Sequence, residues 1–249
     1  MNKLISTIKS ESEDTKKLMR HIPSGVVVLF VVSVVLMNLL ANKEIYTGVS
    51  WLALDCGLIL SWLSFLCMDI LTKRFGPKAS IKLSLFAVGV NLFVCVVFKL
   101  VSIIPGNWGE FYSSGHQIVN DSLNSTIGGT WYVLLGSTVA FIISAVVNAV
   151  LNHTIGNMWH QNSFKAYAIR SYVSTFFAQF VDNFIFSIIV SHTFFGWTLV
   201  QCITCSLTGC LIELICEVIF SPFGYKVCKR WEADNVGQGY LDSLERRKQ

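Results

Sequence analysis

Polar and charged side chains interrupt an apolar stretch at residues 167–195. The stretch is long enough to cross a membrane, because about 20 apolar residues span the ~30 Å hydrocarbon core of a bilayer. At about 100° per residue, one sector of such a helix is polar or small, and it holds Ser174, Thr175, Ala178, Gln179 and Asp182. An ionisable residue at bilayer depth costs ~2.5–3.5 kcal/mol on insertion scales. The stripe is therefore either a hydrogen-bonded seam between helices or the wall of a polar binding site.

Arg170 lies 12 residues before Asp182 in the same stretch. That spacing is about 18 Å along a helix axis, so the two side chains cannot pair with each other. Each therefore needs a partner on another helix or in a ligand.

A second apolar segment places acids and a tryptophan on one helix face. Asp55, Trp62, Asp69 and Lys73 follow one another at spacings of 7, 7 and 4 residues. Asp69 either pairs with Lys73 at the cytoplasmic interface or belongs to a binding site. Trp62, in mid-segment, is either a stacking surface for a flat ligand or a packed core residue. Asp55, near the outer end, is expected at the membrane interface.

Other apolar segments contribute amides and two further acids. Asn38 and Asn91 lie in the first and third segments, and Glu213 and Glu217 lie four residues apart in the last. Like charges at that spacing repel, so each glutamate needs a cation or a proton. We interpret them mainly as part of an ion-pair network at an inner gate, with Lys73 among the candidate cations.

The composition is that of an all-α polytopic membrane protein. Of the 249 residues, 53% are hydrophobic and 14% are charged, against about 25% charged in soluble domains. Six spans are predicted, at about 22–41, 51–71, 81–104, 131–151, 167–195 and 198–220, leaving a long loop at 105–130. Residues 21–230 then form one transport domain between tails at 1–20 and 231–249.

The distribution of basic residues sets the orientation. With six spans, 17 of the 19 Lys and Arg residues fall on the side that holds both termini. Cytoplasmic loops carry the excess of Lys and Arg, so both termini are predicted to be cytoplasmic in a multi-pass protein of the cell (inner or plasma) membrane.

The motifs of common enzymes are missing from the sequence. It contains no Walker, dinucleotide-binding, HExxH or GxSxG pattern. The Cys202–Cys205 CxxC lies in an apolar span without a second pair. We therefore expect no enzyme activity, metal or cofactor. Carboxylates, amides and aromatic rings suit a flat heterocycle with several N–H donors, because a carboxylate accepts two parallel hydrogen bonds from a guanine-like edge.

Four segments resemble the queuosine precursor transporters, also called the vitamin uptake transporter family. They are LMNLLANKEI at 36–45, MDILTKRFG at 68–76, RSYVSTFFAQFVDNFIF at 170–186 and ELICEVIFSPFGYKV at 213–227. The resemblance implies a secondary transporter that imports 7-cyano-7-deazaguanine, 7-aminomethyl-7-deazaguanine or queuine for tRNA modification. The positions that match the family's motifs are Asn38, Asp69, Arg170, Ser174, Gln179 and Asp182.

Two positions depart from the family's pattern. Lys73 stands where the family has Glu, and Glu213 stands where it usually has Lys. We therefore hypothesise an ion pair between Lys73 and Glu213 at the cytoplasmic end, in which the two charges have exchanged places relative to the family's pattern.

The expected partners are a small-molecule base and the lipid bilayer, not nucleic acid, and a homodimer is left open. Two other functions fit the same composition. One is the substrate-binding membrane component of a multi-subunit importer with a separate ATP-driven module. The other is a non-transporting membrane scaffold.

Overall fold

The structure, a computed structural model, describes residues 2–158 and 164–246; within these ranges the side chains of 2–10, 155–158, 164–171 and some single positions are not described. The described residues are mostly helical, and they include one antiparallel pair of short strands, in which Glu44 pairs with Asp55. The elements are α1 (Asn2–His21), α2 (Ser24–Leu40), β1 (Glu44–Ile45), β2 (Leu54–Asp55), α3 (Leu58–Phe75), α4 (Pro77–Ile103), α5 (Gly109–Ser114), α6 (Gln117–Met158), α7 (Phe164–Phe186), the π-helical turn η1 (Ser187–Ser191), α8 (His192–Phe194), α9 (Leu199–Ala233) and α10 (Gln238–Arg246).

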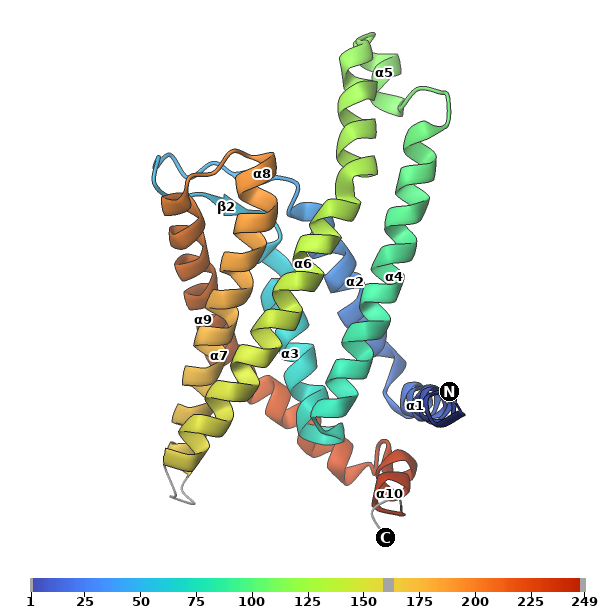
Figure 1. The fold of residues 1–249 in the computed structure, drawn as a ribbon, viewed down its shortest axis with the longest axis vertical. Coiled ribbons are helices and arrows are strands. Elements are labelled where there is room, and N and C mark those ends of the chain that lie inside the picture. The colour runs from blue at the N-terminus through green and yellow to red at the C-terminus, as the bar shows by residue number, and fades with distance from the viewer. Residues whose placement is uncertain (1, 159–163, 247–249) are drawn as a thin grey trace.

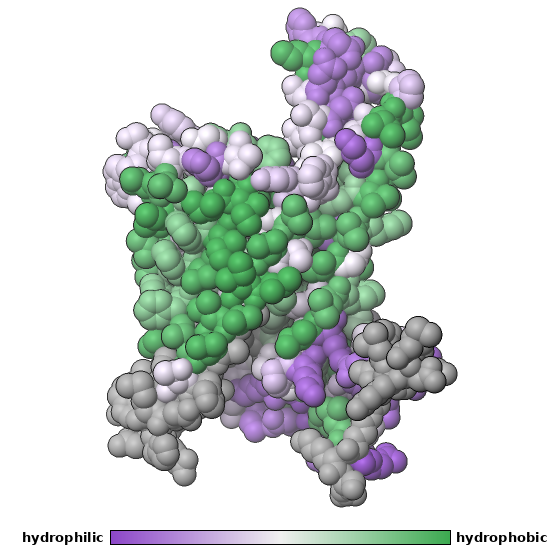
Figure 2. Space-filling view, in the orientation of Figure 1, coloured by the Kyte–Doolittle hydropathy of each residue, from purple (hydrophilic) through white to green (hydrophobic). Residues whose placement is uncertain are grey.

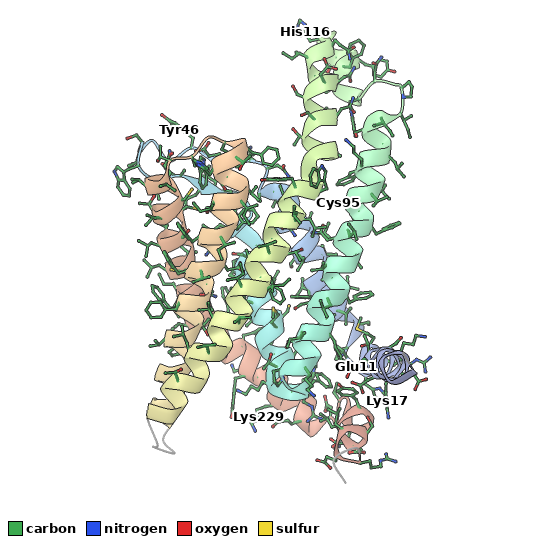
Figure 3. The ribbon with its side chains drawn as sticks, in the orientation of Figure 1. Glu11, Lys17, Tyr46, Cys95, His116 and Lys229 are labelled. Atoms are coloured by element: carbon green, nitrogen blue, oxygen red, sulfur yellow. The ribbon has the colours of Figure 1, made fainter. Side chains whose placement is uncertain are left out.

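The helices α2, α3, α4, α6, α7 and α9 run alongside one another as a bundle (Figure 1). Helix α6 packs between α4 and α7, α9 packs against α7 and α3, and α2 packs against α3 and α4. The chain termini lie at one end of this bundle, and β1 and β2 lie at the other (Figure 1). Figure 3 shows Glu11, Lys17 and Lys229 at the end with the termini, and Tyr46 and His116 at the opposite end.

The outer surface of the bundle is apolar. Figure 2 shows a broad hydrophobic band across its middle, with hydrophilic residues gathered toward the two ends. Large side chains on α4, α6 and α9 are exposed in this band, among them Phe93, Ile142 and Ile219. Apolar patches of this extent are rare on soluble monomers, so this surface faces lipid.

Within the part of the chain that the structure describes, four helices are long and apolar enough to cross a membrane: Pro77–Ile103, Gln117–Ser144, Thr175–Phe194 and Leu199–Phe220. A fifth span is counted if the pair Glu11–His21 and Ser24–Leu40, bent by 109°, forms one. Of the other two predicted spans, α2 has only 17 residues, and the 18 residues of α3 include Asp69, Lys73 and Arg74. The six-span count therefore stays a prediction.

Two segments expected to be polar tail and loop are helical instead. Residues 2–21 form α1, and the predicted loop at 105–130 contains α5 and the first turns of α6. Helix α6 is 42 residues long, so it extends past the apolar band toward His116 (Figures 2 and 3). The hydropathy pattern located the apolar part of α6 and missed its polar beginning, which Asn120 anchors by accepting a 2.8 Å hydrogen bond from the Trp108 backbone.

Both terminal helices are fastened to the same end of the bundle. Leu18 of α1, Leu71 and Phe75 of α3 and Tyr240 of α10 belong to one buried apolar cluster. Arg74 of α3 donates two hydrogen bonds, of 3.0 and 2.8 Å, to the carbonyl of Val236 just before α10. Lys82 of α4 pairs with Glu11 at 3.0 Å and with Asp14. The ends of the chain thus cover one end of the helical bundle.

Candidate functional site

A cavity lies inside the bundle, on the side of β1 and β2. Its volume is about 80 Å³, several times the ~10–15 Å³ that one water molecule needs. Phe65 of α3 and Phe186 of α7 form part of its apolar wall. Its polar wall comes from five helices and a strand and consists of Asn38, Asp55, Ser61, Ser137, Asp182, Asn183 and Glu213.

Helix α7 supplies two adjacent polar residues from the middle of its span. Asp182 Oδ1 accepts a 2.8 Å hydrogen bond from Ser144 Oγ of α6. Asn183 Nδ2 donates a 3.3 Å hydrogen bond to Glu213 Oε2 of α9. Hydrogen bonds to an ionised acceptor are stronger than those between neutral groups, so these contacts fix the two carboxyl groups and tie α7 to both neighbours.

The site depends on close helix contacts at two glycines. A Cβ atom at Gly209 of α9 would lie 2.9 Å from Asn183 Nδ2, so glycine leaves the space in which the amide reaches Glu213. A Cβ at Gly57 would lie 2.8 Å from both Asp55 Oδ1 and the Met37 carbonyl. The Gly57 backbone also donates a 2.8 Å hydrogen bond to Asp55 Oδ1. This acid is therefore held at the start of α3, where the helix dipole favours negative charge.

A π-helical turn follows the polar part of α7. It places Val190 against α6, where a Cβ at Gly136 would clash with the Val190 Cγ2 atom. The next residue of α6, Ser137, lines the cavity. Such π-helical turns are frequent at functional sites, and this one adjusts the end of α7 to the α6 surface beside the cavity.

Three of the predicted site residues line the cavity: Asn38, Asp182 and Glu213. Asn38 is buried and donates a 3.0 Å hydrogen bond from Nδ2 to the Val34 carbonyl of its own helix. Gln179 and Asn91 are buried outside the cavity wall, and Gln179 Oε1 and Asn91 Nδ2 have no hydrogen-bond partner. The side chains of Asp69, Arg170, Ser174 and Glu217 lie outside the described residues.

Trp62 packs against protein rather than facing the cavity. Its ring stacks on Phe220 of α9, with the centroids 4.4 Å apart and the planes at 15°. Its Nε1 donates a 2.9 Å hydrogen bond to the Ile59 carbonyl. Of the two interpretations offered for this residue, the structure corresponds to the packed one.

Lys73 and Glu213 have separate partners. Lys73 Nζ lies 4.1 Å from the centroid of the Tyr225 ring, whereas Glu213 bonds to Asn183. Tyr225 follows Glu213 by 12 residues on α9, a rise of about 18 Å. The hypothesised ion pair is therefore not formed in this structure.

Sequence reasoning missed four polar residues of the cavity: Asp55, Ser61, Ser137 and Asn183. Asp55 was expected at the membrane interface because it precedes the apolar part of α3. The structure places it in β2, paired with Glu44 of β1, and in the wall of the cavity. Asn183 adjoins Asp182 in the sequence, which was a usable signal. Ser61 and Ser137 carried none, because single serines are common in apolar helices.

Among the residues that the structure describes, no group of three His, Cys, Asp or Glu side chains is placed to hold a metal ion. The three cavity acids come from three separate elements, β2, α7 and α9. That arrangement suits an extended organic guest that meets carboxylates and amides from several directions.

No curated protein and no solved structure matches this chain. One family model does, the family described as "Putative vitamin uptake transporter", over residues 55–227. The match runs from Asp55 past Glu213 and so contains the cavity wall except for the part contributed by α2. The chain therefore belongs to the vitamin uptake transporter family, whose members are membrane transporters for vitamin-like small molecules, and it is a multi-pass protein of the cell membrane.

Proposed function

We propose that this transporter imports 7-deazaguanine bases, the precursors of queuosine in tRNA. The observation that carries the proposal is the position of Asp182, whose carboxylate lines an aromatic-walled cavity in the middle of an apolar span. A guanine-like edge offers an N1–H and an exocyclic amine side by side. A carboxylate accepts both hydrogen bonds in parallel.

The other cavity residues have separate roles in this proposal. Asn38 and Asn183 orient the base by hydrogen bonds, and Phe65 and Phe186 contact its apolar faces. Water in the cavity is displaced when the base enters. Gln179 lies one helical turn from Asn183 on α7, toward the end with the termini, and contacts the base as it moves inward. Asp69 is proposed as a second acceptor for the guanine-like edge, Ser174 as a residue that orients the base, and Arg170 as the partner of an acid near the inner gate.

The chain is proposed to cross the membrane six times with both termini in the cytoplasm. The two chain termini lie at one end of the bundle, which supports an even number of crossings (Figure 1). In the six-span topology, 17 of the 19 Lys and Arg residues also fall on the side of the termini, as expected for the cytoplasmic side. The cavity then belongs to the outer half of the bundle.

A packed contact between α3 and α9 separates the cavity from the cytoplasmic end. It consists of the Trp62–Phe220 stack, Gly224 against Leu66 and Ile70, and Lys73 over Tyr225. Import requires this contact to open while the outer side closes, as alternating access demands.

The test is uptake of labelled 7-deazaguanines, and the queuosine content of tRNA, in cells that cannot make the bases. Asp182→Asn replaces one acceptor oxygen by a donor. A lost hydrogen bond to a charged group costs ~1.5–3 kcal/mol, so uptake should fall about 10- to 100-fold at equal protein level. The matched control is Asp234→Asn, on an exposed carboxylate at the end of α9, and its uptake should equal that of the parent.

Two results would replace the proposal. If Asp182→Asn leaves the queuosine content of tRNA as in the parent, the chain is a scaffold or acts on another solute. If the purified chain in vesicles binds the base but does not accumulate it, it is the substrate-binding component of a larger importer.

A further inference from the structure

The cavity carries three carboxylates and no cation. Asp55 of β2, Asp182 of α7 and Glu213 of α9 line it, whereas no Lys, Arg or His belongs to its described wall. The described ion pairs lie outside it: Lys82 pairs with acids of α1, and Lys229 and Arg230 pair within the C-terminal end of α9. The described wall of the site therefore offers acidic side chains and no basic one.

The hydrogen bonds at these acids come from neutral donors. Asp55 accepts from the Gly57 backbone, Asp182 from Ser144 and Glu213 from Asn183. Neutral donors reduce the cost of placing a carboxylate at membrane depth, but they add no positive charge. Three carboxylates around one small space also repel one another. A guest that brings a positive charge relieves this repulsion, whereas a neutral guest does not.

The acids come from three separate elements, and the described residues contain no group of three acids, His or Cys placed to ligate one ion. A cation that satisfies carboxylates on different walls must be extended, with hydrogen-bond donors at more than one end.

A buried amide one helical turn from the cavity wall has an oxygen without a hydrogen-bond partner. Gln179 is 4% exposed, and its Oε1 accepts no hydrogen bond. It lies four residues before Asn183 on α7, so both side chains occupy the same helix face about 6 Å apart along the axis. An unpaired buried acceptor is unfavourable, and an N–H donor on the moving guest would satisfy it.

We propose that the site is specific for 7-deazaguanines that carry a protonated amine on the 7-substituent, and that it discriminates against the neutral 7-cyano base. The inference rests on the proposed function. The guanine-like edge bonds to Asp182, and the ammonium group pairs with Glu213, the most deeply buried of the three acids. An aliphatic amine, with a pKa near that of lysine at about 10.4, is fully protonated at neutral pH.

The experiment measures uptake of 7-aminomethyl- and 7-cyano-7-deazaguanine separately by the full chain in cells lacking the synthesis pathway. The parent should take up the aminomethyl base at least about tenfold more efficiently than the cyano base. That ratio is expected because only the aminomethyl base makes the charged contact. Glu213→Gln should lower this ratio about tenfold or more, and Glu213→Asp should keep it close to that of the parent. The ratio is independent of how much protein reaches the membrane. Asp55→Asn provides a second variant should Glu213→Gln fail to fold.

The outcomes separate the two proposals. If the parent takes up neither base, the proposed function fails. If it takes up both equally, or if Glu213→Gln and Asp55→Asn reduce both uptakes by the same factor, the function stands and the specificity for amines is overturned. A protein that used a proton as the counter-charge would give that second pattern.

Discussion

The amide of Asn183 connects two helices at the cavity wall. It donates to Glu213 in space left by Gly209, because a Cβ there would lie 2.9 Å from the amide nitrogen. Gly209→Ala should displace the amide and weaken its hydrogen bond to the carboxylate. Contacts of this kind are worth ~1.5–3 kcal/mol, so we expect base uptake to fall about 10- to 100-fold, measured as initial rate at equal membrane abundance.

Gly89→Ala is the matched control for that substitution. Gly89 lies within α4, and a Cβ there meets nothing within 4 Å. Alanine favours the helix over glycine by ~1 kcal/mol, so the control should transport at the parental rate with unchanged or higher thermal stability. Equal rates for the Gly209 and Gly89 variants would show that the Asn183–Glu213 contact has no part in binding.

At the scale of single elements, α9 is the helix best suited to move. Pro222 lies within it, between Phe220, which stacks on Trp62, and Gly224, which packs on Leu66. Proline has no backbone N–H and interrupts the helix ladder, and helices bend at such positions. The interruption thus coincides with the α3–α9 contact that closes the cavity on the side of the chain termini.

Pro222→Ala should therefore slow transport without weakening binding. An uninterrupted ladder makes bending more costly, and a penalty of ~1.4 kcal/mol on the opening step lowers its rate about tenfold. The measurement compares uptake in vesicles with equilibrium binding to the purified protein. Pro77→Ala is the control, because Pro77 occupies the first turn of α4, where a missing N–H breaks no helical bond. A proportional loss of binding and uptake would contradict a hinge at this position.

At the scale of the whole molecule, the two ends of the bundle should face opposite compartments. His116 is exposed beyond the apolar band at one end, and Lys229 is exposed at the end with the termini (Figure 3). With both termini in the cytoplasm, His116→Cys should react with a membrane-impermeant maleimide in intact cells, and Lys229→Cys only after permeabilisation. The parent chain, with its eight native cysteines, gives the background. Reaction of both variants in intact cells would rule out the proposed orientation.

The apolar segments and their polar faces could be read from the sequence. Span length sets where α4 and α9 lie, and helix periodicity puts Asp182 on a face that must avoid lipid. These are local properties, fixed by residue type and spacing along one chain segment. Periodicity selected Asp182, and the family resemblance selected Asn38. Glu213 was expected in an ion-pair network at an inner gate, but the structure brings it to the same cavity as the other two.

Which faces meet was decided only by the tertiary structure. Asp55, in the strand pair β1–β2, lines the cavity, which its position in the sequence did not indicate. Trp62 shares a face with the acids of its segment but stacks on Phe220, and Lys73 lies over Tyr225 rather than beside Glu213. Periodicity specifies the faces of each helix but not the rotation and offset at which two helices pack. Those depend on close contacts, such as that at Gly209, made between residues distant in sequence.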